Sequence, residues 1–402
     1  MGGIVISNKM SSFISVQISR IRRLFWLLLA MVIRSLVKVD RKSIFFWSYN
    51  FKQYACSPKY LCEYILKKHP GEYRLYWGLN HNVDTSSIPK GVTVVRHCSL
   101  KYLIALYRSK FIVNNMRNFR MDSFFFKKKE QKYLMCWHGS IALKKIEKDV
   151  EKQLGEYTCN VSKKDSQDCD LMMAGSQFFH DIIRNAFWYD GEIYDGGAPR
   201  DDVLFDPDFI RSADKKVRQY YGIKKETVIV LYAPTFRSDY SITHFKLEWN
   251  RVIEAFSQLS EKPCMLLLRL HPNMIGKFDE KDLNLGADVI DCTKFLDMQE
   301  LLASADYLIT DYSSSMFDFS IMGKPCFLYA DDKGEYDRGF YFKLDELPFV
   351  LSETQPDLLN NIIKFDVETY NQRVNDFYNE KIRLWAKGNA CRDIFNWIKN
   401  NS

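Results

Sequence analysis

The sequence predicts an α/β protein with two parallel sheets, and three observations lead to that prediction. Short apolar strand segments alternate with helix-like segments along most of the chain, which is the pattern of a largely parallel sheet. These segments form two series, separated by a polar, charged stretch at 200–225 that we interpret as the domain junction. The chain has 402 residues, of which 47% are hydrophobic, and this is enough for two domains with proper cores.

The first 40 residues are expected to form a basic amphipathic segment. Its uninterrupted apolar part, 24–33, is about half of the ~20 residues needed to span a bilayer. Basic residues flank this part on both sides: Arg20, Arg22, Arg23, Arg34 and Lys38. Our preferred interpretation is a Trp-containing helix that lies in the membrane interface. An ordinary core helix and a signal peptide are the alternatives, although no small-residue cleavage site follows.

The first predicted domain spans 41–205 and the second spans 206–402. The expected strands of the first domain are 43–48, 73–78, 92–96, 111–114, 133–137 and 171–174, with helices that include 58–68 and 99–108. Those of the second domain are 228–232, 265–270, 289–291, 307–310 and 326–329, with helices at 247–259 and 298–303. The stretch 357–398 is helical in pattern, and its last part is expected to pack back on the first domain.

Ligands of open α/β sheets bind beyond the carboxyl ends of the strands, so the residues that follow each strand are site candidates. His138 and Gly139 follow the strand at 133–137. A glycine allows close approach of a ligand, and a histidine can take a proton from a hydroxyl near neutral pH. Ser140 is expected to cap a helix that carries Lys144 and Lys145. The alternative interpretation is a capped turn with an incidental histidine.

Two strands of the second domain end in basic residues. Thr235 and Arg237 follow 228–232, where they offer a hydroxyl and a bidentate phosphate donor, or form a surface turn. Arg269 and His271 end the strand at 265–270. A buried arginine needs an anionic partner, either an internal carboxylate or a substrate phosphate.

The sequence "TDYSSSMFDFS" at 310–320 places Ser313, Ser314 and Ser315 between a strand and a short helix. Free N–H groups and the helix dipole make such a turn an anion site. Asp311 is expected to hold a ribose hydroxyl or to orient a neighbour. Asp318 shares a helix face with Ser314 and is expected to brace the loop. A further loop, after 326–329, gathers four polar residues: Asp331, Asp332, Tyr336 and Arg338.

Composition and missing motifs narrow the function classes. The net charge of +7 fits an anionic substrate, an anionic membrane surface or nucleic acid without choosing among them. Neither a Walker loop nor GxGxxG occurs, which argues against a nucleotide triphosphatase or a nicotinamide enzyme; "DGGAPR" at 195–200 is interpreted as a domain-edge turn. No nucleic-acid motif is present. Ten cysteines without a CxxC pair indicate reduced thiols in a cytosolic protein, and no zinc site.

Several segments resemble the CDP-glycerol glycerophosphotransferase family, which includes teichoic acid and capsule glycerol-phosphate and ribitol-phosphate transferases. They are "WHG" with "LKK", "YAPTFR", "RLHPN" and "TDYSSSMFDFSIMGKPCFLYADD" with "YDRGFYF", within 133–342. The resemblance implies a GT-B fold, with an acceptor-side and a CDP-donor domain facing each other across a cleft. It implies transfer of an alditol phosphate, glycerol phosphate foremost, from a CDP-activated donor to a hydroxyl of a lipid-linked polyol-phosphate or glycan acceptor, with release of CMP. It also implies a peripheral protein at the cytoplasmic face of the bacterial membrane.

The resemblance further implies that His138 and His271 are the functional histidines. It implies diphosphate and glycerol contacts around Asp311, Ser313, Ser314 and Asp318. In our hypothesis His138 removes the proton of the acceptor hydroxyl, while His271, two arginines and the serine turn neutralise the phosphates. The sequence departs from the family at Ser140, near which relatives often have a proline.

Two other functions compete with this one. A GT-B glycosyltransferase that uses a nucleotide sugar is the second hypothesis, and a non-catalytic, membrane-bound assembly factor is the third. No carboxylate cluster demands a metal, and Mg²⁺ on the diphosphate stays an open alternative. The choice between CDP-glycerol and CDP-ribitol, between one addition and many, and between teichoic acid and capsule is left open.

Overall fold

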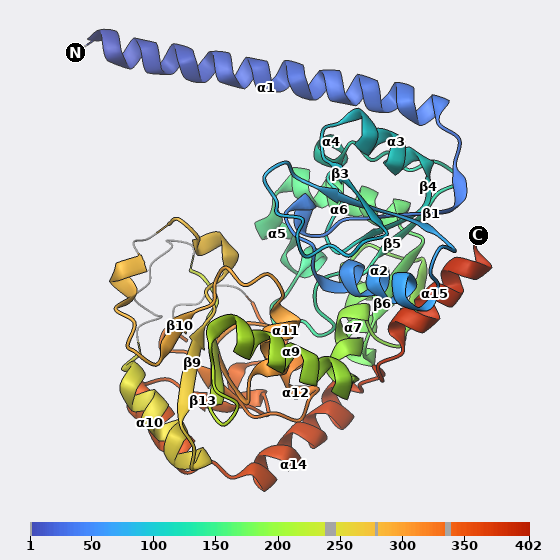
Figure 1. The fold of residues 1–402 in the computed structure, drawn as a ribbon. Helices are drawn as coiled ribbons and strands as arrows, with labels where there is room; N and C mark the ends of the chain where they lie inside the picture. The colour runs from blue at the N-terminus through green and yellow to red at the C-terminus, as the bar shows by residue number, and fades with distance from the viewer. Residues whose placement is uncertain (1, 238–246, 278–279, 334–338) are drawn as a thin grey trace.

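Two parallel sheets organise the computed structural model, which describes residues 2–237, 247–277, 280–333 and 339–402 (Figure 1). Within these ranges the first sheet has the strand order β3-β2-β1-β4-β5-β6-β7 and the second has β10-β9-β8-β11-β12-β13. Counted within each sheet, both orders begin 3-2-1-4-5-6, the arrangement of the Rossmann fold. The predicted pair of Rossmann-like units is therefore confirmed.

An inner strand of the first sheet, β1, is buried over its second part. Ile44, Phe45 and Phe46 are all 0% exposed, because helices cover both faces of the sheet. The six predicted strands are present with small shifts at their ends, and β7 is added at the edge. The strands are β1 (Asp40–Phe46), β2 (Arg74–Leu79), β3 (Val92–Arg96), β4 (Ser109–Asn114), β5 (Lys132–Met135), β6 (Leu171–Ala174) and β7 (Glu192–Asp195).

The second sheet contains the five predicted strands and a three-residue edge strand that the sequence pattern is too short to indicate. All pairings in the register are parallel, with β11 between β8 and β12. The strands are β8 (Val228–Ala233), β9 (Cys264–Leu268), β10 (Val289–Asp291), β11 (Tyr307–Thr310), β12 (Cys326–Tyr329) and β13 (Val350–Ser352).

The helices between the strands follow ordinary capping chemistry. Ser99, for example, accepts a hydrogen bond from the Tyr102 N–H at the start of α3. The helices that follow α1 are α2 (Cys56–Lys68), α3 (Leu100–Arg108), α4 (Arg120–Ser123), α5 (Glu151–Leu154), α6 (Glu156–Asp168), α7 (Gln177–Ala186), α8 (Pro199–Asp202), α9 (Pro207–Tyr221), α10 (Trp249–Ser260), α11 (Met298–Ser304), α12 (Ser315–Ser320), α13 (Gln355–Ile363), α14 (Val367–Phe377) and α15 (Ala390–Asn400).

The stretch 200–225 lies between the last strand of the first sheet and the first strand of the second, and it is largely helical. It forms α8 and α9, and Val217 of α9 is buried in a cluster that includes residues of α11. Asp206 caps α9, Pro207 occupies its first turn, and Gly222 ends it at φ +69°. The polar residues of this stretch are the solvent face of an amphipathic helix.

The last helix returns to the first half of the molecule. Ile394, Phe395 and Ile398 of α15 are buried in one cluster with Ile44 of β1 and Leu61 of α2. Figure 1 shows α15 lying beside α2, whereas α14 covers the second sheet. The chain therefore crosses between the two halves twice.

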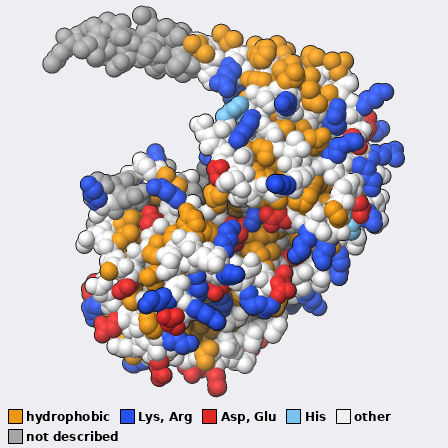
Figure 2. Space-filling model, viewed as in Figure 1, with side chains coloured by type: hydrophobic (Ala, Val, Ile, Leu, Met, Phe, Trp, Pro, Cys, Tyr) orange, Lys and Arg blue, Asp and Glu red, His pale blue; other side chains and the backbone are white. Residues whose placement is uncertain are grey.

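The carboxyl-terminal part of the long helix α1 (Gly2–Leu36) lies along the first half, whereas its amino-terminal part projects past the body (Figure 1). From residue 17 onward, where its side chains are described, Trp26, Leu27 and Ile33 pack on the first core. The opposite face exposes apolar residues by 48% to 73%: Ile18, Ile21, Leu24, Phe25, Leu28, Met31, Val32 and Leu36. Figure 2 shows this face along the upper surface, and the molecular outline is indented between the two halves. No described helix is both long and apolar enough to cross a membrane.

Candidate active site

The candidate residues follow strands that flank, or lie next to, the places where the two sheets change winding direction. In each sheet the chain turns one way from the first strand and the other way from the fourth, which leaves a crevice beyond the carboxyl ends of neighbouring strands. These switch points lie between β1 and β4 and between β8 and β11. The ideal Cβ position of Gly139, after β5, is 3.6 Å from the Ser314 hydroxyl, after β11. The two predicted halves of the site therefore meet.

His138 is held so that one ring nitrogen faces away from its anchor. Its Nδ1 lies 3.1 Å from the carbonyl oxygen of Asn115, and because a carbonyl can only accept, Nδ1 carries the proton. The other nitrogen, Nε2, is therefore the acceptor in the neutral ring. Burial lowers the pKa of His138 to about 4, with the Asn115 hydrogen bond opposing this shift and the charge of Arg200 adding to it. The neutral form is thus ready to take a proton at neutral pH.

The loop after His138 differs from the prediction. The expected helix carrying Lys144 and Lys145 does not form; instead Lys144 forms an antiparallel bridge with Phe340. Ser140 caps no helix, because its hydroxyl donates to the buried carboxylate of Asp201. The loop stays within the first half and contacts the second half through this bridge, with backbone hydrogen bonds from Lys145 to Gly339 and from Tyr341 to Leu143.

His271 has the opposite tautomer. The backbone N–H of Asn273 donates to its Nδ1 at 3.2 Å, so the proton of the neutral ring is on Nε2. The ring packs against Phe236, with centroids 4.7 Å apart, while its edge is open to solvent. Partial desolvation and the positive charges of Arg269 and Lys144 lower the pKa of His271. His138 is therefore suited to accept a proton and His271 to donate a hydrogen bond.

Asp311, Thr235 and Arg237 are brought together, but they bind one another. The Asp311 carboxylate accepts from the Thr235 N–H at 2.8 Å and from its hydroxyl at 2.5 Å. Arg237 donates to Asp311 at 3.0 Å and forms a bidentate pair with Asp332 at 2.6 and 3.0 Å. The guanidinium that the sequence suggested for phosphate is thus held by two carboxylates. The other residues predicted for this loop, Tyr336 and Arg338, lie outside the described residues.

Arg269 is a buried cation for which the described residues supply no carboxylate partner. It is 8% exposed, and its Nη1 donates to the carbonyl oxygens of Cys292, at 3.0 Å, and of Thr293. No carboxylate of the described chain lies within ion-pair distance of it. Of the two partners weighed from the sequence, an internal carboxylate is absent from the described residues, and a substrate phosphate stays a prediction.

The serine turn forms a short hydrogen-bonded unit before α12. The Ser313 and Ser315 hydroxyls lie 2.8 Å apart, and Ser314 stands at the N-cap without a side-chain capping bond. Asp318, in α12, is buried and accepts from Arg200 and, at 3.1 Å, from Gln299. The partners of Asp318 therefore lie outside the serine turn, and bracing of the turn stays a prediction; its partner Arg200 is new.

Sequence reasoning missed Arg200, Asp201 and the buried pair Lys59–Asp297. Lys59 of α2 pairs with Asp297, the N-cap of α11, and the Tyr60 hydroxyl donates to the same carboxylate at 2.9 Å. From the sequence we placed Arg200 at the end of "DGGAPR", which we assigned to a domain-edge turn, and Asp201 in the predicted junction at 200–225. Side-chain pairing over such distances in the chain leaves no periodic pattern.

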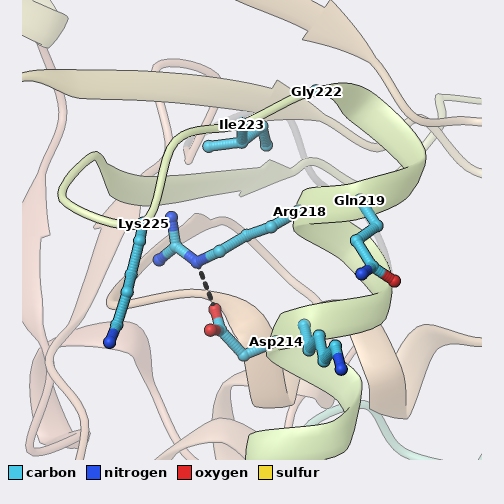
Figure 3. A pocket seen from close by; sticks show the side chains of 7 residues that line it. Asp214, Arg218, Gln219, Gly222, Ile223 and Lys225 are labelled. Atoms are coloured by element: carbon cyan, nitrogen blue, oxygen red, sulfur yellow. Dashed lines mark hydrogen bonds and ion pairs between the residues drawn. The ribbon is translucent and has the colours of Figure 1, made fainter.

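Other features of the described residues do not point to this site. A pocket of about 530 Å³ lies at the end of α9, lined by Asp214, Arg218, Lys225 and neighbours (Figure 3). Its Arg218 is engaged with Asp214 at 2.7 Å, and none of the residues that line it is a predicted site residue. The part of the chain that the structure describes holds no group of three potential metal ligands. All ten cysteines are free thiols.

Comparison with known proteins identifies the family. The model of the family "CDP-Glycerol:Poly(glycerophosphate) glycerophosphotransferase" matches residues 29–400, so the chain belongs to this family. It is 32% identical to a teichoic acid glycerol-phosphate transferase of Staphylococcus aureus, covering 89% of this chain and 93% of that protein. It is 28% identical to a teichoic acid poly(glycerol phosphate) polymerase of Bacillus subtilis, covering 90% of this chain but 49% of that protein. The chain thus spans about half the length of that relative.

Solved structures agree. The wall teichoic acid polymerase TagF superimposes with a TM-score of 0.79 at 26% identity, over 96% of this chain and 98% of that one. A histidine-to-asparagine variant of that polymerase, soaked with CDPG, gives the same score. This likeness confirms the predicted GT-B-like fold with two Rossmann-like units.

The buried neutral state of His138 predicts a pH-dependent stability. The pKa of His138 in the folded state lies below its unfolded value of about 6.5. Between pH 6.5 and 4 this histidine is therefore protonated in the unfolded chain but largely neutral in the folded one. The contribution of the neutral ring is fully present above pH 6.5 and is lost as the pH falls toward 4. The free energy of unfolding, measured with urea between pH 7 and 4.5, should therefore fall more steeply with decreasing pH for the wild type than for H138Q. Equal pH dependence of the two proteins contradicts the assignment.

Proposed function

We propose that this member of the CDP-glycerol:poly(glycerophosphate) glycerophosphotransferase family transfers an alditol phosphate from a CDP-activated donor to a hydroxyl of a lipid-linked acceptor. Glycerol phosphate is the first candidate for the group transferred, CMP is the product released, and teichoic acid or a capsular polymer is the destination. The acceptor class is a polyol phosphate or a glycan on a lipid. The observation that carries the proposal is the hydrogen bond from His138 Nδ1 to Asn115, which leaves Nε2 able to accept a proton, next in the chain to Gly139, whose Cβ position is 3.6 Å from the Ser314 hydroxyl.

The reaction needs little covalent chemistry from the protein. An acceptor oxygen attacks the phosphorus next to the alditol, a new P–O bond forms, and the P–O bond to the CMP phosphate breaks. His138 Nε2 takes the proton of the attacking hydroxyl, while Nε2–H of His271 donates to a phosphate oxygen. Arg269 places an uncompensated positive charge at the end of β9, on the side where negative charge builds up on the departing CMP.

The assigned residues differ in what they do for the donor. Ser313, Ser314 and Ser315 offer hydroxyls beside Gly139, which lets the phosphates approach the backbone. Asp311, Thr235, Arg237 and Asp318 act one layer further out in our proposal, because each is already bonded to another side chain. They fix the loops that carry the contacting groups.

The test of this function is product formation by the purified protein with a lipid-linked acceptor analogue. CDP-glycerol, CDP-ribitol and UDP-sugars are supplied separately, and release of CMP or UDP is measured against elongation of the acceptor. CMP from one CDP-alditol, in step with product, supports the proposal and identifies the donor. UDP from a sugar donor, with no CMP from either CDP-alditol, overturns it in favour of a glycosyltransferase. Repeating the assay with EDTA decides whether Mg²⁺ takes part.

Loss of the base should lower turnover and spare donor binding. We expect H138A to lose about 10²–10⁴-fold in kcat, the range typical of general-base help, with an unchanged dissociation constant for the donor. His180, a surface histidine paired with Asp195 at 2.8 Å, supplies the matched control H180A, which should keep wild-type kcat. Near-normal turnover of H138A would rule out its role as base.

Loss of the positive charge of Arg269 should weaken binding of the CDP-activated donor. Hydrogen bonds to charged groups contribute about 1.5–3 kcal/mol, so R269Q should raise the donor KM by about 10–100-fold. R251Q is the control, because Arg251 is exposed on α10 and pairs with Glu248 alone among the described residues. An unchanged KM in R269Q means that the donor phosphates do not reach this strand end.

We propose that α1 attaches the protein to the anionic cytoplasmic face of the membrane as a peripheral protein. Its bare face is apolar, while exposed Arg20, Arg22 and Lys38 supply positive charge beside it. Arg23 and Arg34 instead fix the helix to the body, through Asp122 and through the Phe126 carbonyl at 2.9 Å.

This attachment predicts that a smaller fraction of the double variant L24E/L28E than of the wild type floats together with vesicles. Both leucines are more than half exposed, so the change removes apolar surface and adds repulsion without disturbing the core. Flotation with phosphatidylglycerol vesicles measures the loss, and I363E, at a similarly exposed position on α13, is the control. Equal flotation of the three proteins contradicts a docking role for α1.

A further inference from the structure

The turn α8, which the sequence led us to treat as a domain edge, lies buried between the two halves of the site. Arg200 and Asp201 are 7% and 0% exposed. The guanidinium of Arg200 reaches in two directions at once. Its Nη1 donates to the backbone carbonyl of His138, and its Nη2 donates to the carboxylate of Asp318 in α12.

Asp201 holds the same loop two residues further on. Its Oδ2 accepts from the Ser140 hydroxyl, while its Oδ1 lies 3.9 Å from Arg200 Nε. The backbone N–H of Arg200 donates to the Ser57 hydroxyl of α2 at 3.3 Å, which anchors the turn to the first half. The segment that carries His138 is thus held at both ends by adjacent residues of one turn.

We propose that Arg200 is a positioning residue that fixes the backbone of His138 relative to α12, so that the base and the serine turn keep one geometry. This inference rests on the proposed function, in which His138 is the base. Arg200 itself does not touch the reacting atoms in this account; it acts through His138 and Asp318.

The geometry requires an arginine. A planar guanidinium presents several donors in a rigid fork, so it can bind a carbonyl on one side and a carboxylate on the other, whereas a lysine ammonium is a point charge on a flexible stem. The Arg200–Asp318 pair is also buried, where an unpaired charge costs free energy and the guanidinium has few alternative partners. A displacement of about 1 Å at a reacting group can cost about 10²-fold in rate.

Arg200 also acts on His138 by its charge. After burial, the positive charge of Arg200 is the factor that lowers the pKa of His138, against the Asn115 hydrogen bond. The charged or titratable groups that face Arg200 come from several elements: Asp318, Cys56, Tyr49 and Asp201. The rings that face His138 are those of Trp137 and Tyr49, with centroids 4.3 and 6.4 Å away.

The first test compares R200K with a variant that removes another buried ion pair between the two halves. We expect R200K to lower kcat by about 10–10²-fold with a donor KM within about threefold of wild type, because positioning and not donor contact is lost. The control is K59M, since Lys59–Asp297 also joins the halves but does not contact the His138 loop. A wild-type kcat in R200K, or an equal loss in K59M, overturns the proposal.

The second test uses the pH profile, which a merely structural residue does not move. R200Q removes the charge, so the pKa of His138 rises and the acid limb of kcat/KM moves to higher pH; R200K keeps the charge and leaves the limb in place. If R200Q fails to fold, the double variant R200Q/D318N replaces it, because no unpaired buried charge is left. An acid limb that does not move in the charge-removing variant overturns the proposal.

A titration of His138 by NMR separates this inference from the proposed function. The ring signals are assigned by their loss in H138Q, and the titration needs no substrate. A higher pKa of His138 in the charge-removing variant supports the link through Arg200, and an unchanged one overturns it. Absence of CMP release by the wild type, in contrast, overturns the proposed function alone.

Discussion

A strand buried on both faces cannot carry polar groups along its length, and this constraint places the chemistry of the molecule. In β8 and β11 nearly every residue is apolar and buried, whereas β1 is buried only over its second part, Ser43–Phe46, after a polar start that is partly exposed. Polar side chains are therefore confined to the ends of strands, where the backbone leaves the sheet and meets solvent. His138, Arg269 and the serine turn all stand at such ends. The parallel arrangement brings these ends to one edge, so a site arises from residues far apart in the chain.

The relation between the two halves depends on a few buried charges. Lys59–Asp297 and Arg200–Asp318 each cross from one half to the other, and each is nearly excluded from solvent. Desolvation makes such pairs poor sources of net stability, yet breaking one partner leaves an unpaired buried charge, so the charges favour one alignment over all others. The bridge between Lys144 and Phe340 adds backbone hydrogen bonds to the same contact.

The sequence was a good guide wherever the signal was local. Apolar runs predicted eleven strands because a buried strand has a short, continuous pattern, and the residues that follow a strand can simply be read from it. The same reasoning failed for Arg237, whose bond to Asp332 spans 95 positions, and for Ser140, whose partner Asp201 is 61 positions away. It failed for α9 because a helix with two buried residues looks like a polar linker. Arg200 was missed because its partner Asp318 is distant in the chain and because its own segment looks like a polar linker.

The return of α15 to the first sheet has a consequence for synthesis of the chain. The face of the first sheet that includes Ile44 is completed by Ile394 and Ile398, yet β7 ends at Asp195 and α15 begins at Ala390. At about 5–20 residues per second, the ribosome needs about 10–40 s to make the intervening residues. During that interval the first half has an unfinished hydrophobic face. Completion of the amino-terminal unit is thus coupled to synthesis of α15, and this face of the sheet stays uncovered until then.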